Sequence, residues 1–112
     1  MKWVVAILAL SAFITTTHAA EKGTKEIEAL GQLNGKALAC SQTENISRIK
    51  AVMIKHSPKL RYYGAIFEKT TEESFMNRSQ DQDACVDAPL IALQIEDIEK
   101  RLVSLFAARK QP

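Results

Sequence analysis

The chain contains two cysteines, Cys40 and Cys85, and their number is the strongest single constraint on its fold. Two cysteines allow one intrachain pairing, so the sequence predicts a Cys40–Cys85 disulfide if the protein folds in an oxidising compartment. The alternative is a pair of free, buried thiols. In the chain-entropy description, a disulfide that closes a loop of this size stabilises the folded state by roughly 4 kcal/mol.

Residues 1–20 have the pattern of a secretory signal peptide. Lys2 provides a positive start, and Trp3 to Ile14 is an apolar run interrupted by one serine. Cleavage after Ala19 is favoured over cleavage after Ala20, because the second choice places a large histidine at the third position before the cut. An uncleaved membrane anchor is the competing interpretation, but the run is shorter than the roughly 20 residues that span a bilayer. The sequence therefore predicts a periplasmic or secreted protein without a transmembrane segment in the mature chain.

Residues 21–112 are predicted to form a single helical domain. The clearest helix follows Asp87, which is placed to cap it. Its apolar residues recur at spacings of four and three, which is the pattern of a helix packed in a bundle. Glu96 with Lys100, and Asp97 with Arg101, form favourable i,i+4 pairs on the opposite side. The apolar residues are Ile91, Ile95, Ile98, Leu102 and Leu105.

Three earlier helices complete the prediction. The first covers about 24–39, and its apolar face consists of Ile27, Leu30, Ala37 and Leu38, with Leu33 at its margin. Gly31 and Gly35 lie on a flank of this helix and indicate that another helix packs closely there. The second opens with the capping box Ser41–Glu44 and ends at Ser57–Pro58. The third starts at Ser57–Pro58, presents Leu60, Tyr63, Ile66 and Phe67, and weakens after Thr70; Asn77 to Ala84 is predicted to be a polar loop.

This layout agrees with the cysteine positions. In an up-down-up-down bundle, the end of the first helix and the start of the fourth lie at the same end of the molecule. Cys40 ends the first helix and Cys85 precedes the fourth, so the two can meet. A domain this small buries a modest fraction of its surface and commonly depends on such a crosslink. The predicted fold class is all-α: a small antiparallel four-helix bundle closed by one disulfide after removal of the signal peptide.

The sequence predicts no enzyme, cofactor or metal site. His56 is the only histidine of the mature chain, and its neighbour Ser57 has no orienting acid nearby in sequence. The cysteines do not form a redox-active Cys-x-x-Cys pair. Asp81, Asp83 and Asp87 share one loop, but the loop lacks the glycine and final glutamate of an EF-hand, so a solvated acidic turn is favoured.

A basic segment is the most distinctive predicted surface. No acidic residue lies between Ile46 and Phe67, whereas acids predominate from Glu68 to Glu99. Removal of Lys2 lowers the formal net charge from +2 to +1, which gives no general argument for nucleic acid binding. A partner-binding site is therefore predicted at the turn between the second and third helices, for an acidic surface. The alternative is that these residues are simply solvated at the turn, where their positive charge stabilises the end of the second helix. The site residues are Lys55, His56, Lys59, Arg61 and Tyr62.

In size, signal peptide and single disulfide, the chain is similar to small exported helical proteins of bacteria, namely acid-stress chaperones and immunity proteins. That similarity implies a protein that acts by binding an exported or envelope protein, as an inhibitor, immunity protein or chaperone. A carrier that holds an apolar or lipid ligand in its bundle core is the alternative. Asn45 and Asn77 each begin a glycosylation sequon, which has a meaning only in a eukaryotic source, whereas the signal peptide favours a periplasm.

Overall fold

The computed structural model describes residues 21–80 and 85–107. The predicted signal peptide, residues 1–20, lies outside the described residues, as do Asp81 and Asp83 of the predicted acidic loop.

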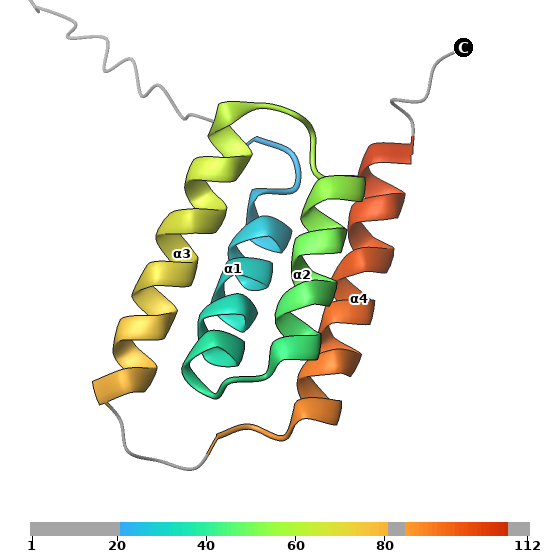
Figure 1. Cartoon of the computed structure of the whole chain (residues 1–112). Helices are drawn as coiled ribbons and strands as arrows, with labels where there is room; N and C mark the ends of the chain where they lie inside the picture. Colours follow the sequence, from blue (N-terminus) through green and yellow to red (C-terminus); the bar gives the residue numbers. More distant parts are fainter. Residues whose placement is uncertain (1–20, 81–84, 108–112) are drawn as a thin grey trace, which may run out of the picture.

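The described chain forms four helices, in agreement with the predicted all-α fold. They are α1 (Thr24–Ala39), α2 (Thr43–His56), α3 (Arg61–Gln80) and α4 (Ala88–Phe106). Figure 1 shows that α1 and α3 run in one direction and that α2 and α4 run in the other. The protein is therefore a small antiparallel four-helix bundle with up-down-up-down connections.

Helix α1 is the centre of the bundle. It packs against each of the other three helices, and α2 packs against α4. Among the described residues, the backbone of α3 approaches the backbone of α1 and that of no other helix. The core thus lies mainly between α1, α2 and α4, and α3 contributes Tyr63 to it while covering a further side of α1. The buried core residues are Ile27, Leu30, Leu33, Ala37, Ile49, Val52, Tyr63, Ile91, Ile95, Ile98 and Leu102.

The glycine flank of α1 is the surface that receives α3. A Cβ atom on Gly31 would overlap the hydroxyl of Thr70, and one on Gly35 would lie 2.6 Å from the backbone nitrogen of Phe75. Only a residue without a side chain permits this approach of two helices. The predicted close packing is confirmed, and the structure identifies α3 as the helix that packs there.

Four residues of the predicted apolar stripe of α4 are buried as expected, namely Ile91, Ile95, Ile98 and Leu102. Leu105 is only half-buried, and Phe106 packs against the core instead. In α1 the prediction was wrong about two leucines. Leu33 is buried at 6% exposure, whereas Leu38 is 40% exposed. The reason is that α4 packs on the Leu33 side of α1, whereas Leu38 lies at the edge of the contact between α1 and α3.

The predicted disulfide joins Cys40 and Cys85, whose Cα atoms are 5.8 Å apart. Both cysteines lie at the end of the bundle where α1 ends and α4 begins, as the up-down-up-down layout requires (Figure 1). The distance is within the range of unstrained disulfides.

The predicted capping box at the start of α2 is wrong. Ser41 has a positive φ of 53°, and α2 has Gln42 at its N-cap position without a side-chain capping bond. The Ser41 amide donates to the carbonyl of Leu38, and the Gln42 amide donates to that of Ala37. This is the Schellman motif that ends a helix, so Ser41 closes α1 and does not open α2.

The predicted start of the third helix is wrong as well. Ser57 is the extended residue that ends α2, and α3 begins only at Arg61. Residues 57–60 therefore form a linker, and Leu60, which was assigned to the buried face, is 54% exposed. Proline at the first helical position is compatible with a helix but does not by itself nucleate one.

Helix α3 also extends beyond its predicted end. Asn77, assigned to a polar loop, lies inside the helix, which continues to Gln80. At the other side of this connection, Asp87 occupies the N-cap position of α4 as predicted, but its side chain makes no capping bond. Its carbonyl oxygen accepts the first helical hydrogen bonds instead, from the amides of Leu90 and Ile91.

Asn45 fastens the start of α2 to the start of α4. Its side-chain amide donates to Oε1 of Gln42 at 2.9 Å and to the carbonyl oxygen of Ala88 at 3.0 Å, and the residue is 4% exposed. The side-chain amide of Gln42 in turn donates to the carbonyl oxygen of Val86 at 2.8 Å. A glycan on Asn45 would have to replace these bonds, so this sequon has a structural role in the fold.

We expect Asn45→Ala to lower the free energy of unfolding by about 1–3 kcal/mol, because it removes a buried side-chain amide together with its bonds to Gln42 and to the carbonyl oxygen of Ala88. The measurement is urea unfolding followed by circular dichroism. Ser47→Ala is the matched control, since it removes the same sequon at an exposed position and should change stability by less than about 0.5 kcal/mol. Equal stabilities of the two variants would contradict the assigned role of Asn45.

Candidate functional site

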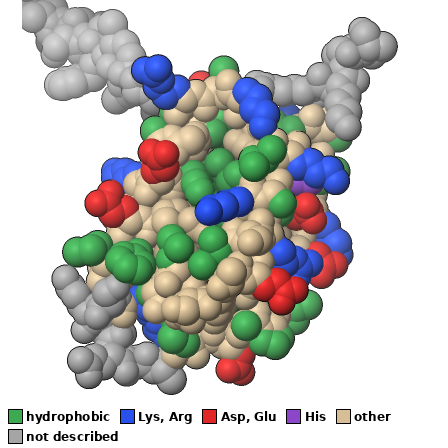
Figure 2. All heavy atoms as spheres, viewed as in Figure 1, with side chains coloured by type: hydrophobic (Ala, Val, Ile, Leu, Met, Phe, Trp, Pro, Cys, Tyr) green, Lys and Arg blue, Asp and Glu red, His purple; other side chains and the backbone are tan. Residues whose placement is uncertain are grey.

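The predicted site residues lie together at the end of the bundle where α2 ends and α3 begins. We call this surface the basic end, defined by Lys55, His56, Lys59, Arg61 and Tyr62. Lys55, Lys59 and Arg61 are exposed, and basic side chains gather at this end in the face shown in Figure 2. The basic end lies opposite the disulfide (Figure 1).

His56 has an acidic neighbour that sequence position did not indicate. Its Nε2 lies 3.1 Å from Oε2 of Glu99 on α4. The basic end is therefore partly balanced by an acid from another helix, although none is close to it in the sequence. The Ser57 hydroxyl donates to the carbonyl oxygen of Pro58, and Ser57 is buried at 8% exposure.

Two other site residues also have contacts within the chain. The ammonium of Lys59 donates to the carbonyl oxygen of Ile54 in the last turn of α2. A cation at this position suits the negative end of the helix dipole. The hydroxyl of Tyr62 is 3.0 Å from that of Thr24 at the start of α1, while 41% of Tyr62 stays exposed. These contacts hold the basic end in one arrangement.

A hollow of about 290 Å³ opens at the basic end, between the last turns of α2 and α4. Lys55 and His56 lie on its α2 side, and Leu102, Val103 and Phe106 line it from α4. Val103 is 45% exposed, so apolar surface is accessible beside the two basic side chains. Sequence reasoning missed this combination because α4 was interpreted only by its buried stripe.

Lys59, Arg61 and Tyr62 do not line this hollow. The structure thus separates the predicted site into a hollow with Lys55 and His56, and a neighbouring turn with the other three residues.

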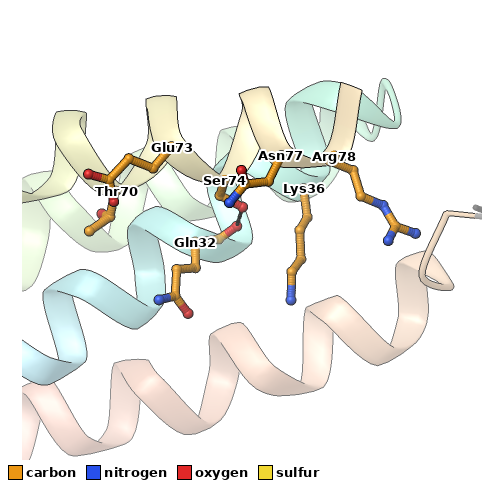
Figure 3. A pocket seen from close by; sticks show the side chains of 7 residues that line it. All are labelled: Gln32, Lys36, Thr70, Glu73, Ser74, Asn77 and Arg78. Atoms are coloured by element: carbon orange, nitrogen blue, oxygen red, sulfur yellow. Dashed lines mark hydrogen bonds between the residues drawn. The ribbon is translucent and has the colours of Figure 1, made fainter. Parts of the chain in front are cut away.

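A second cavity, on α1 and α3, was not predicted. It measures about 300 Å³ and is lined by polar side chains of both helices (Figure 3). The hydroxyl of Ser74 donates to the backbone carbonyl oxygen of Gln32 at 2.7 Å. Figure 3 shows the Gln32 and Lys36 side chains directed away from α3. We call this the polar cavity, lined by Gln32, Lys36, Thr70, Glu73, Ser74, Asn77 and Arg78.

The polar cavity contains both signs of charge, with Lys36 and Arg78 against Glu73. Such mixed charge does not select one class of ligand. In residues 21–80 and 85–107, no group of three or more histidine, cysteine or acidic side chains is arranged to hold a metal ion.

Comparisons with known proteins reveal no similarity. No family model matches the chain, and neither the curated proteins nor the solved structures give a match. None of the described helices has the length and apolar character that a membrane span requires.

Proposed function

We propose that this protein is exported after removal of residues 1–20 and acts by binding another exported or envelope protein, not by catalysis. The signal-peptide pattern of residues 1–20 supports export, and the Cys40–Cys85 disulfide is of the kind that persists in oxidising compartments. Inhibitor, immunity and chaperone-like roles all belong to this class.

The observation that carries the proposal is the hollow at the basic end. Lys55 and His56 border accessible apolar surface of Val103 and Phe106 there. Basic groups beside apolar surface complement an acidic partner that also presents an apolar side chain. The exposed Arg61 and Tyr62 extend the same end of the molecule and are residue types enriched in protein interfaces.

Arg61→Glu is expected to slow association with the partner several-fold at low salt, because exposed charges act mainly on the encounter rate and are screened within about 10 Å at moderate salt. Arg61 is the first residue of α3, where a negative charge suits the helix dipole, so the fold should be unaffected. Lys59 is not chosen because its ammonium caps α2.

Lys69→Glu is the matched control, since it makes the same charge change at an exposed position within α3. Proteins captured from the native compartment by the wild type would be purified, and their association rates with the wild type and with both variants would be measured. If both variants associate at the wild-type rate with the same salt dependence, the basic end is a solvated turn and the proposal fails.

A carrier function in the bundle core is the alternative. The centre of the bundle is occupied by fully buried side chains such as Ile27, Tyr63 and Leu102, which a core ligand would have to displace. Mass spectrometry of gently purified protein distinguishes the two functions, because a carrier is expected to arrive with its ligand.

A further inference from the structure

A groove lies on α1 and α3 that shares none of its lining residues with the polar cavity or the basic end. It measures about 280 Å³, and its apolar surface comes from Leu38, Phe67 and Phe75. Leu38 is 40% exposed and Phe75 is 38% exposed. We call it the apolar groove.

The border of the apolar groove is acidic. Glu68 and Glu72 of α3 line it one helical turn apart, both are exposed, and no basic residue is among those that line it. Figure 2 shows acidic side chains above hydrophobic ones along the α3 edge of the molecule. Like charges at this spacing repel each other, so a cation placed between them would be favourable.

Asn34 lies under the apolar groove and has one unused polar atom. Its amide nitrogen donates to the hydroxyl of Thr71 at 3.2 Å, while its carbonyl oxygen has no hydrogen-bond partner in the described part of the chain. The residue is 5% exposed, and a buried acceptor without a donor is unfavourable. A donor brought in by an occupant of the groove would remove that disadvantage after a small shift of the side chain.

We propose that the apolar groove docks an amphipathic helix of a partner protein, one that carries lysine or arginine beside large apolar side chains. The apolar side chains would cover Leu38, Phe67 and Phe75, and the basic ones would pair with Glu68 and Glu72. Helices recognise such grooves through apolar anchors at i, i+3, i+4 and i+7. This surface is opposite in charge to the basic end, so the proposal is independent of the proposed function.

The test uses two synthetic helical peptides with the same leucine and phenylalanine stripe, one flanked by lysines and one by glutamates. Their binding to the disulfide-bonded protein is measured by fluorescence anisotropy at low salt. We expect the lysine peptide to bind at least ten times more tightly than the glutamate peptide. Amide chemical-shift changes should centre on Phe67, Thr71 and Phe75.

Glu72→Lys should weaken binding of the lysine peptide several-fold and strengthen binding of the glutamate peptide. Glu73→Lys is the matched control, because it makes the same change one residue along α3, on the side of the polar cavity. Thermal melting of both variants verifies that they fold. Equal binding of the two peptides, or an equal loss in the two variants, would overturn the proposal. Shift changes at the groove that grow with protein concentration alone would overturn it too, and would assign the groove to a second copy of the chain.

Discussion

Replacing Cys40 and Cys85 by serine is expected to lower the free energy of unfolding by about 4 kcal/mol. The bond joins residues separated by 45 positions in the sequence, and its loss frees the unfolded chain to explore many more conformations. Small domains have a total free energy of unfolding of about 5–15 kcal/mol, so the variant should lose a large part of its stability. Urea unfolding of wild type and variant measures the difference.

Two controls belong to the disulfide experiment. Reduction of the wild-type protein should lower its stability by a similar amount, and thiol titration of the denatured, unreduced protein should find no free thiol. Two titratable thiols in protein taken from its native compartment would show that Cys40 and Cys85 are not bonded there. A serine variant as stable as the wild type would contradict the assigned contribution.

Gly35→Ala is expected to destabilise the protein by about 2–3 kcal/mol, although alanine is the better helix former. A Cβ at this position would lie 2.6 Å from the backbone nitrogen of Phe75, and a backbone atom cannot turn aside as a side chain does. Helix α3 would have to move away from α1, and the bond between Asn34 and Thr71 would be lost with it. Thermal and urea unfolding give the magnitude.

Gly64→Ala is the control for this substitution, because it lies within α3 and a Cβ there meets no atom within 4 Å. It should stabilise the protein by about 0.5–1 kcal/mol, which is the difference between glycine and alanine in a helix interior. Opposite signs for Gly35→Ala and Gly64→Ala would establish that close packing requires the glycine. Stabilisation by both would show that α1 and α3 are not in close contact.

The sequence was sufficient to predict those helices that bury a regular apolar stripe. The residue limits of α1 agree with prediction. The buried side of α4 also agrees, because burial of Ile91, Ile95, Ile98 and Leu102 follows the helical period. The placement of Cys40 and Cys85 then determined which ends of the bundle meet.

Helix α3 was predicted less well because its contact with α1 is not made of apolar stripes. Thr70, Thr71 and Ser74 lie against the glycine flank, and their hydroxyls bond to backbone carbonyls or to Asn34. A periodic pattern of hydrophobicity does not detect an interface built from hydroxyl groups. For the same reason the apolar pattern weakens after Thr70, and the last turn of α3, from Asn77 to Gln80, was mistaken for the start of a polar loop.

The candidate site shows a second limit of sequence reasoning. The basic residues were found from their composition, but the approach of Glu99 to His56 and the apolar lining from α4 depend on tertiary contacts. Residues that are 43 positions apart carry no local pattern that joins them.

The backbone of α3 approaches only that of α1, although Tyr63 in its first turn is buried in the core and contacts the ring of Phe106 on α4. The part of α3 after Phe67 lies on α1 outside the interior that α1, α2 and α4 surround, so we expect this part to open at one interface. Its amide hydrogens would then exchange with solvent through a sub-global opening, without unfolding of the remaining helices. The cystine keeps the segment that contains α3 tethered at both ends, so the opened helix stays close and recloses as an intramolecular step. A molecule that binds across α1 and α3 in the closed state therefore shifts this equilibrium toward the closed state by mass action.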